Sequence, residues 1–142
     1  MLCYFMNPEQ FARFRKSHQF NEKLYNIGRV AEAEVIDKLR TYFDDEFIQP
    51  LPEGNTFDFI GTTKYIELKS RTVYRFTYED TAIGVKKIEK ALADTQNDYY
   101  FVFKFVNGLF YIKLDKTVPL RLGKINNIEH YFISVKQLTE IL

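Results

Sequence analysis

Two stretches of the chain repeat their apolar residues at the three- and four-residue spacing of an α-helix. In residues 21–43 the repeated positions are Val35, Ile36, Leu39 and Phe43. The second stretch follows Asp80 and Thr81, which can cap a helix, and its apolar positions are Val85, Ile88 and Leu92. Because this spacing places side chains on one face, both stretches predict helices packed against a core. Asn7 followed by Pro8 predicts a further short helix nearer the N-terminus.

Shorter apolar segments, separated by turn-forming residues, have the composition and length of β-strands. The first three are predicted at residues 47–49, 57–60 and 64–70. Two more, at 99–105 and 109–114, are joined by Asn107-Gly108, which favours a tight hairpin. A last extended segment is predicted at 131–133. It precedes Ser134, which with Gln137 three residues later predicts the start of a final helix.

The order of these elements predicts an α/β fold in one domain that covers residues 1–142. The chain is 46% hydrophobic and 17% aromatic, which is enough to bury one sizeable core. No linker, repeat or low-complexity tract divides it. No cleavable leader follows Met1, and no apolar run reaches the roughly 20 residues of a membrane-spanning helix. We therefore expect a soluble, intracellular protein without a membrane partner.

Several classes of functional site lack the residues that they require. One cysteine and two histidines cannot form a structural zinc site or an internal disulfide framework. None of the serines lies in the glycine-flanked turn of a serine hydrolase, and no glycine-rich phosphate loop occurs. Lys and Arg outnumber Asp and Glu by only 20 to 19, so a nucleic acid would have to bind a local basic surface. Carboxylate and lysine chemistry remains.

Residues 57–71, FDFIGTTKYIELKSR, combine a strand-forming pattern with charged side chains. Because alternate residues of a strand share a face, Glu67 and Lys69 point to the same side, opposite Ile66. Asp58 lies nine residues before Glu67, across a glycine turn, and in a hairpin its carboxylate can reach Glu67. Two carboxylates and an amine are therefore predicted to converge.

The predicted pair of Asp58 and Glu67 has the chemistry of a magnesium site. Magnesium takes a few oxygen ligands, keeps several waters and activates one of them against a phosphoryl group, while Lys69 can orient that water or neutralise charge on the phosphate. Glu32 lies one turn before the apolar residues of the first helix, on the same face, and is a third candidate acid. The alternative is that this end of the helix face is exposed to solvent. Each residue also has an ordinary structural interpretation, as a cross-strand ion pair, a solvated strand face or a turn acid.

The order of these residues resembles that of the PD-(D/E)XK nucleases, the restriction-endonuclease-like superfamily. GRVAEAEVIDKL, with Gly28 and Glu32, is similar to the family's G-x-x-x-E helix. Asp58 followed by Glu67-Leu68-Lys69 is similar to its core motif. The predicted order of helix, three strands, helix and strand over residues 28–106 is also similar to the family's core.

The resemblance implies a restriction-endonuclease-like core, in which helices flank a mixed β-sheet in αβββαβ order. It implies that Asp58 and Glu67 bind Mg²⁺, for which Mn²⁺ can substitute, with the Leu68 carbonyl as a backbone ligand. Glu32 would contact the metal directly or through water, and Lys69 would be the catalytic lysine. The implied reaction is hydrolysis of a phosphodiester by a metal-activated water, which leaves a 5′-phosphate.

Two features qualify the resemblance. Phe57 stands where the proline of the motif often lies. The Gly-Arg-x-Ala-Glu helix opening and the small size are most similar to Holliday-junction resolvases, although 27 residues precede Gly28 here. We therefore expect a DNA nuclease, with a structure-specific endonuclease or resolvase as the particular type.

A local excess of basic residues surrounds the motif. Residues 61–90 contain seven Lys or Arg against four Asp or Glu. The candidate phosphate contacts are Arg71, Arg75, Lys86 and Lys87, although lysines on a helix are as often simply solvated. DNA is the expected partner, and the residues do not distinguish it from RNA. Cleavage of both strands of a duplex needs two sites, so we expect a homodimer.

Two other interpretations compete with the nuclease. The first is a module that keeps a nuclease fold and binds nucleic acid or a protein without cutting. The retention of Asp58, Glu67 and Lys69 together argues against it, since such a module does not need all three. The second is an interaction domain whose charged strand face is solvated. The nuclease requires the carboxylates of Glu32, Asp58 and Glu67 and the amine of Lys69 to gather in one cleft, and it is excluded if Asp58 and Glu67 point to opposite faces of the sheet.

Overall fold

The computed structural model describes residues 22–142. Its first half contains α2 (Glu22–Tyr42), β1 (Gln49–Pro50), β2 (Phe59–Gly61), β3 (Lys64–Ser70), β4 (Asp80–Gly84) and α3 (Val85–Ala93). Its second half contains β5 (Asp98–Phe105), β6 (Gly108–Leu114), β7 (Arg121–Ile125), β8 (Ile128–Ser134), the 3₁₀ turn η2 (Val135–Gln137) and β9 (Thr139–Ile141).

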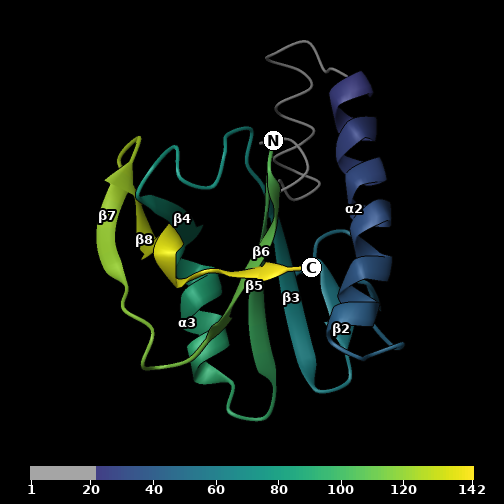
Figure 1. The fold of residues 1–142 in the computed structure, drawn as a ribbon. Coiled ribbons are helices and arrows are strands. Elements are labelled where there is room, and N and C mark those ends of the chain that lie inside the picture. Colours follow the sequence, from purple (N-terminus) through teal and green to yellow (C-terminus); the bar gives the residue numbers. More distant parts are fainter. Residues whose placement is uncertain (1–21) are drawn as a thin grey trace.

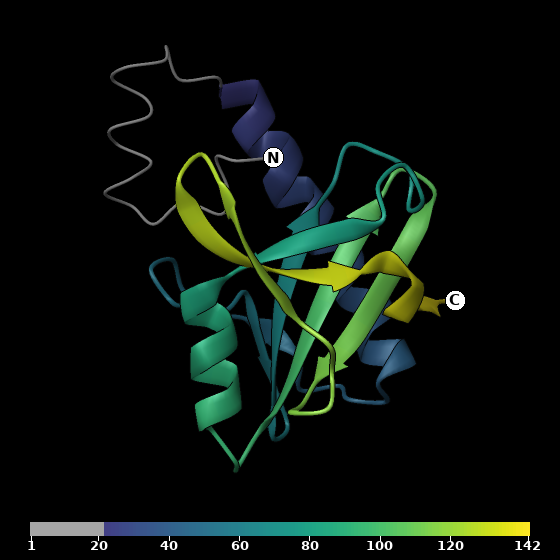
Figure 2. The same ribbon diagram turned by 90° about the vertical axis from the view of Figure 1, so that its left-hand side faces the viewer.

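The strands form two sheets. The larger sheet has the order β1-β2-β3-β5-β6-β9, in which β3 and β5 run parallel and all other neighbours run antiparallel. The smaller sheet has the order β4-β8-β7 and is antiparallel. Helix α2 lies along one face of the larger sheet, while α3 and the smaller sheet cover the other (Figures 1 and 2). The fold is thus mixed α/β with a mixed sheet flanked by helices, as the sequence predicted.

Each face of the larger sheet has its own apolar core. Against α2 the buried residues include Val35, Leu39, Phe59, Ile66 and Leu68. Against α3 and the smaller sheet they include Phe57, Ile88, Phe101, Phe103 and Ile133. Strand β3 lies in the middle of the sheet and is buried on both faces, so a charged side chain that points toward α3 enters a covered layer.

Most of the predicted elements are present near their expected positions. The first helix begins at Glu22 and ends at Tyr42. The predicted strands at 64–70, 99–105 and 109–114 match β3, β5 and β6. The predicted hairpin joins β5 to β6, but its turn residues are Val106 and Asn107, and Gly108 already pairs with Phe105. The strands predicted at 47–49 and 57–60 are displaced by one or two residues toward the C-terminus. The helix predicted at Asn7 lies outside the described residues.

Two helix predictions were wrong at their ends. Asp80 and Thr81 do not cap a helix but begin strand β4, which pairs with β8, and α3 starts only after Gly84. The alternation of buried and half-buried residues along β4 explains the difference, because the period of two belongs to a strand. Ser134 does accept a hydrogen bond from the Lys136 N–H, but the turn that it caps is a single 3₁₀ turn before β9.

The hairpin of β7 and β8 was not predicted. Its turn is formed by Asn126 and Asn127, whose φ angles are 50° and 64°. Asparagine tolerates this left-handed conformation, and two such residues form the turn that suits the twist of a hairpin. Within the described residues, no helix is both long enough and apolar enough to span a lipid bilayer.

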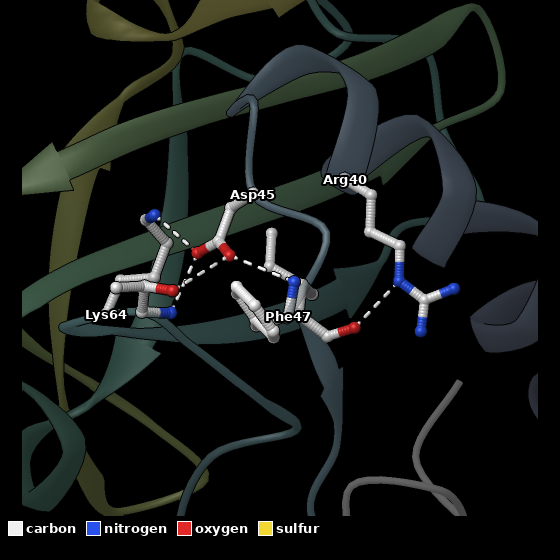
Figure 3. A network of polar contacts seen from close by, with 6 residues as sticks. Arg40, Asp45, Phe47 and Lys64 are labelled. Atoms are coloured by element: carbon white, nitrogen blue, oxygen red, sulfur yellow. Dashed lines mark hydrogen bonds and ion pairs between the residues drawn. The ribbon is translucent and has the colours of Figure 1, made fainter.

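Asp45, in the loop after α2, ties that helix to the hairpin of β2 and β3 (Figure 3). Its carboxylate is only 6% exposed and accepts hydrogen bonds from the Phe47 N–H at 3.1 Å, the Thr62 N–H at 2.8 Å and Lys64 Nζ at 2.7 Å. Burial by itself would raise the pKa of Asp45, but Lys64 and the two backbone donors outweigh burial and lower that pKa to about 2.

Gly61 allows the hairpin to approach this carboxylate. A Cβ at position 61 would lie 2.6 Å from Asp45 Oδ2 and 2.9 Å from Ile48 Cγ1, closer than nonbonded atoms can approach. On the other side of the loop, Arg40 Nε donates a hydrogen bond to the Ile48 carbonyl at 2.8 Å (Figure 3). The end of α2 and the β2–β3 turn are therefore held together by buried polar contacts.

Replacing Asp45 by Asn should lower the free energy of unfolding at neutral pH by about 3 kcal/mol, because Lys64 loses its buried counter-ion. The lowered pKa means that this stabilisation is complete above the ordinary value of 3.8 and is lost as the pH falls through about 2. Urea unfolding of both chains at decreasing pH should therefore show their stabilities converging. Asp37→Asn, which removes an exposed ion pair with Arg40, is the control and should change stability by less than about 0.5 kcal/mol. Equal stabilities at neutral pH would contradict this role of Asp45.

Candidate functional site

Asp58, the residue immediately before β2, lies opposite Glu67 of β3. Strands β2 and β3 pair with Phe59 opposite Ile66, and one step earlier the Asp58 N–H donates to the Ile66 carbonyl at 3.0 Å. Asp58 Oδ2 in turn accepts a hydrogen bond of 2.7 Å from the Leu68 N–H. This bond holds the Asp58 carboxyl against β3 and directs it toward Glu67.

Glu67 is the most deeply buried charged residue of the site. Its side chain points between the sheet and α3, and the residue is 0% exposed. Lys87 of α3 pairs with Glu67 Oε2. The other oxygen, Oε1, is buried and has no hydrogen-bond partner among the described residues. A buried carboxylate oxygen without a donor is costly, so this position favours a cation or a proton. The interpretation of β3 as a strand with a solvated charged face is therefore wrong.

The Asp58 carboxyl responds to the same environment. Burial raises its pKa, and the hydrogen bond and negative charge of Glu67 raise it further, while the Leu68 N–H and Lys87 oppose the shift. The net result is a pKa well above the ordinary value of 3.8. In the absence of a metal, the raised pKa favours a proton shared between the Asp58 and Glu67 carboxyls. A bound cation would replace that proton.

Lys69 is the third member of the group. It follows Glu67 on the same face of β3, one position after the Leu68 N–H that binds Asp58. Burial lowers the pKa of its amine to about 8, against the attraction of Glu67, and the nearby charges of Lys87 and Arg71 lower it further. An amine with such a pKa can exchange a proton near neutral pH more readily than an exposed lysine.

Glu32 does not form a three-carboxylate metal site with Asp58 and Glu67. It is half-buried on α2, and α2 packs on the opposite face of the sheet from α3. In residues 22–142 no three acidic, histidine or cysteine side chains gather closely enough to hold a metal ion by themselves. The pair of Asp58 and Glu67 nevertheless fits magnesium, because this ion is usually bound by one or two carboxylates and keeps waters as its other ligands.

The four predicted phosphate contacts have different positions. Lys86 is exposed, whereas Lys87 is the counter-ion of Glu67. Arg71 Nε and Nη2 donate to Thr81 Oγ1 at 3.0 Å and to the Ala82 carbonyl at 2.7 Å, so this side chain links β3 to β4.

Arg75 is held inside the protein by several contacts. Its guanidinium donates to the carbonyls of Val135 and Leu138 at 3.1 and 2.6 Å, and it lies over the rings of Phe76 and Phe110. These contacts fix the segment before β4 against the η2 turn. The contacts of the Arg75 side chain within the protein therefore explain its presence without a bound phosphate.

The role of Lys87 as the counter-ion of Glu67 was not predicted. From the sequence, Lys87 was a candidate phosphate contact together with Lys86, because the residues that orient α3 are distant along the chain. The burial of Glu67 on a central strand could have suggested that a cation must lie on the covering helix, but the spacing along the chain does not select which lysine.

Comparisons of the chain with protein-family models, with curated proteins and with solved structures give no match. The chemistry of the site is therefore inferred from its own residues.

Replacing Asp58 by Asn should raise the free energy of unfolding in metal-free buffer at neutral pH by about 1 kcal/mol. The amide oxygen can still accept from the Leu68 N–H, and the amide N–H can donate to Glu67 Oε1 without a second negative charge. With its raised pKa, the wild-type Asp58 makes the native state lose stability as the pH rises above 3.8, and the variant should lack this loss. Urea unfolding in EDTA between mildly acidic and neutral pH measures both effects. Asp98→Asn, at a half-exposed ion pair, is the control, and a strongly destabilised Asp58→Asn would contradict the geometry.

Replacing Arg75 by Ala should lower the free energy of unfolding by about 2 kcal/mol, because the carbonyls of Val135 and Leu138 lose their donor. Lys86→Ala, on the exposed face of α3, should leave stability unchanged within about 0.5 kcal/mol. Thermal and urea unfolding of the two variants measure this difference. If Arg75→Ala is as stable as wild type, the structural role of Arg75 is contradicted, and Arg75 is again a candidate phosphate contact.

Proposed function

We propose that this protein is a metal-dependent nuclease that hydrolyses phosphodiester bonds of DNA. The observation that carries the proposal is the buried carboxyl pair of Asp58 and Glu67, in which one oxygen has no donor, with the Lys69 amine beside it. A pair of carboxylates costs stability unless a cation or a proton joins it, and a site with that cost is typical of chemistry at the pair.

Asp58 and Glu67 are the residues that would hold Mg²⁺, or Mn²⁺ in its place. When bound, the metal supplies a water of lowered pKa and polarises a phosphoryl oxygen. Lys69 positions the attacking water or stabilises the charge that develops on the phosphate, and its lowered pKa suits either part. Lys87 pairs with the Glu67 carboxylate and orients it. Glu32 is left with an indirect contact at most, and Leu68 contributes the backbone that fixes Asp58.

The order of elements also supports the proposal. The resemblance to the PD-(D/E)XK nucleases implied helix, three strands, helix and strand, and α2, β1, β2, β3, α3 and β5 follow in that order, with β4 inserted before α3. Glu67 lies on the third strand and Asp58 immediately precedes the second, which fits the positions that the resemblance implies. A structure-specific DNA endonuclease is the type we favour, acting as a homodimer if it cuts both strands of a duplex.

The second candidate is a module on the same fold that binds nucleic acid or a protein without cutting. The ion pair of Lys87 with Glu67 favours it, because a lysine on one carboxylate oxygen lowers the negative charge that a metal requires. In that case Asp58, Glu67, Lys69 and Lys87 form a structural charge cluster. Metal binding and cleavage separate the two functions.

The deciding experiment is a cleavage assay on single-stranded, duplex, flapped and four-way-junction DNA, with single-stranded RNA alongside. Each substrate is incubated with Mg²⁺, Mn²⁺ or EDTA and with wild type, Lys69→Ala or Asp58→Asn. We expect metal-dependent products with 5′-phosphate ends and a rate loss of at least about 100-fold in both variants. Glu32→Gln should have a smaller effect, and Lys116→Ala, at an exposed lysine of the β6–β7 loop, is the matched control.

The assay also has an outcome that overturns the nuclease. Wild type would bind these DNAs but cut none of them with either metal, and calorimetry would show no heat of Mg²⁺ or Mn²⁺ binding that Asp58→Asn removes. The non-catalytic module would then be the better description of the chain.

A further inference from the structure

A cavity of about 420 Å³ lies beside the carboxyl pair, between α3, the segment at residues 51–57 and the first residues of β3 and β5. This volume falls within the range of small-molecule sites in proteins. The cavity lies on the same face of the larger sheet as Glu67, because its wall includes Tyr65 of β3 and residues of α3. None of the roles described above uses it.

The walls of the cavity are aromatic. Tyr65 and Tyr99, on neighbouring strands, are stacked with ring centroids 5.3 Å apart and an angle of 16° between the rings. Phe57 adds a third ring, with its centroid 5.1 Å from that of Tyr99 and 5.9 Å from that of Tyr65. Phe57 and Tyr99 are each only 4% exposed, so Tyr65 is the half-buried ring of this aromatic wall and the one that a flat, unsaturated ligand can reach.

The polar groups of the cavity carry opposite charges. Lys90 Nζ donates to Thr56 Oγ1 at 3.1 Å and lies 5.9 Å from the centre of the Phe57 ring. Asp94 accepts a hydrogen bond of 2.6 Å from the Tyr99 hydroxyl. Hydrogen bonds from Tyr99 and from neighbouring residues lower the pKa of Asp94 to about 2, so it is an anion at neutral pH. A free phosphate in the cavity would face this charge, whereas a nucleobase offers N–H donors to it.

The cavity is continuous with the proposed active site in two ways. Tyr65 and Glu67 are alternate residues on one face of β3, so their Cα atoms are about 6.6 Å apart. Lys87 and Lys90 are three residues apart on α3, where such side chains are neighbours about 5–6 Å apart. Lys87 and Glu67 form one level between sheet and helix, and Lys90 and Tyr65 form the next. The distance between these two levels is spanned by one or two nucleotides at 3.4 Å per step.

We propose that this cavity is a nucleobase pocket, which receives an unpaired base of the strand whose phosphodiester lies at Asp58 and Glu67. The base packs against the aromatic wall at Tyr65, Lys90 approaches the adjoining phosphate, and Asp94 accepts from a ring or amino N–H. The substrate must then expose a base, so the protein acts on single-stranded, flapped or otherwise unpaired DNA and disfavours continuous duplex. This inference rests on the proposed function for its position and deepens it by naming the substrate class.

A fluorescent base tests the pocket. A single-stranded oligonucleotide with 2-aminopurine at successive positions is titrated with the full chain carrying Lys69→Ala, in Mg²⁺. The chain has no tryptophan, so protein emission does not obscure the probe. We expect quenching at one position, about tenfold weaker binding when that position is abasic, and a similar loss in Lys90→Ala and Tyr65→Leu. Lys116→Ala is the matched control, and thermal unfolding checks that Tyr65→Leu is folded.

The same substrates are then cut by chains that retain Lys69. If wild type cuts the strand and prefers a base to an abasic site at the quenched position, and Lys90→Ala loses that preference, the pocket is supported. If wild type cuts but neither variant changes binding or preference, the pocket proposal is overturned while the nuclease stands. If nothing is cut but quenching still depends on Lys90 and Tyr65, the pocket stands and the nuclease fails. If quenching is absent at every position, the pocket proposal is overturned whether or not the strand is cut.

Discussion

The burial of the Glu67 carboxylate is the constraint on which the arrangement around β3 depends. A charged group on a central strand that is covered on both faces needs partners in the dry layer, and breaking such a buried pair costs about 3–5 kcal/mol. Lys87 supplies such a partner from α3, so the ion pair adds to the apolar contacts that hold α3 over β3.

This arrangement is a compromise between stability and chemistry. Two carboxyls beside each other raise the pKa of Asp58 and leave one Glu67 oxygen without a donor, and an apolar or amide side chain would remove both costs. The Asp45 network shows what the same fold does with an acid that serves structure alone. There every oxygen has a donor, and the pKa falls to about 2. Asp45 has a lowered pKa and Asp58 a raised one, and this contrast favours a functional role for Asp58.

Sequence patterns predicted those features that depend on nearby residues. The stripe of α2, the apolar run of β5 and the Asn107-Gly108 hairpin are local signals, and the register of a short hairpin brought Asp58 to Glu67. Strand β4 was mistaken for the start of a helix because its partner, β8, lies about 50 residues away. For the same reason Lys87 and Arg75 were taken for surface residues. The partner of Lys87 is on β3 and that of Arg75 is in the η2 turn. Both contacts join residues that are far apart in the sequence, so a local pattern cannot predict them.

The position of α3 then decides what the site can do. Helix α3 starts at Val85 because β4 ends at Gly84, whose neighbour across the smaller sheet is His130 of β8. A start one residue later would turn every side chain of α3 by about 100° and would move Lys87 away from Glu67. It would also move Lys90 from the Phe57 ring, since both lysines lie on one stripe. The pairing of β4 with β8 (Figure 2), remote from the acids, thus sets the charge beside Glu67 and the shape of the neighbouring cavity together.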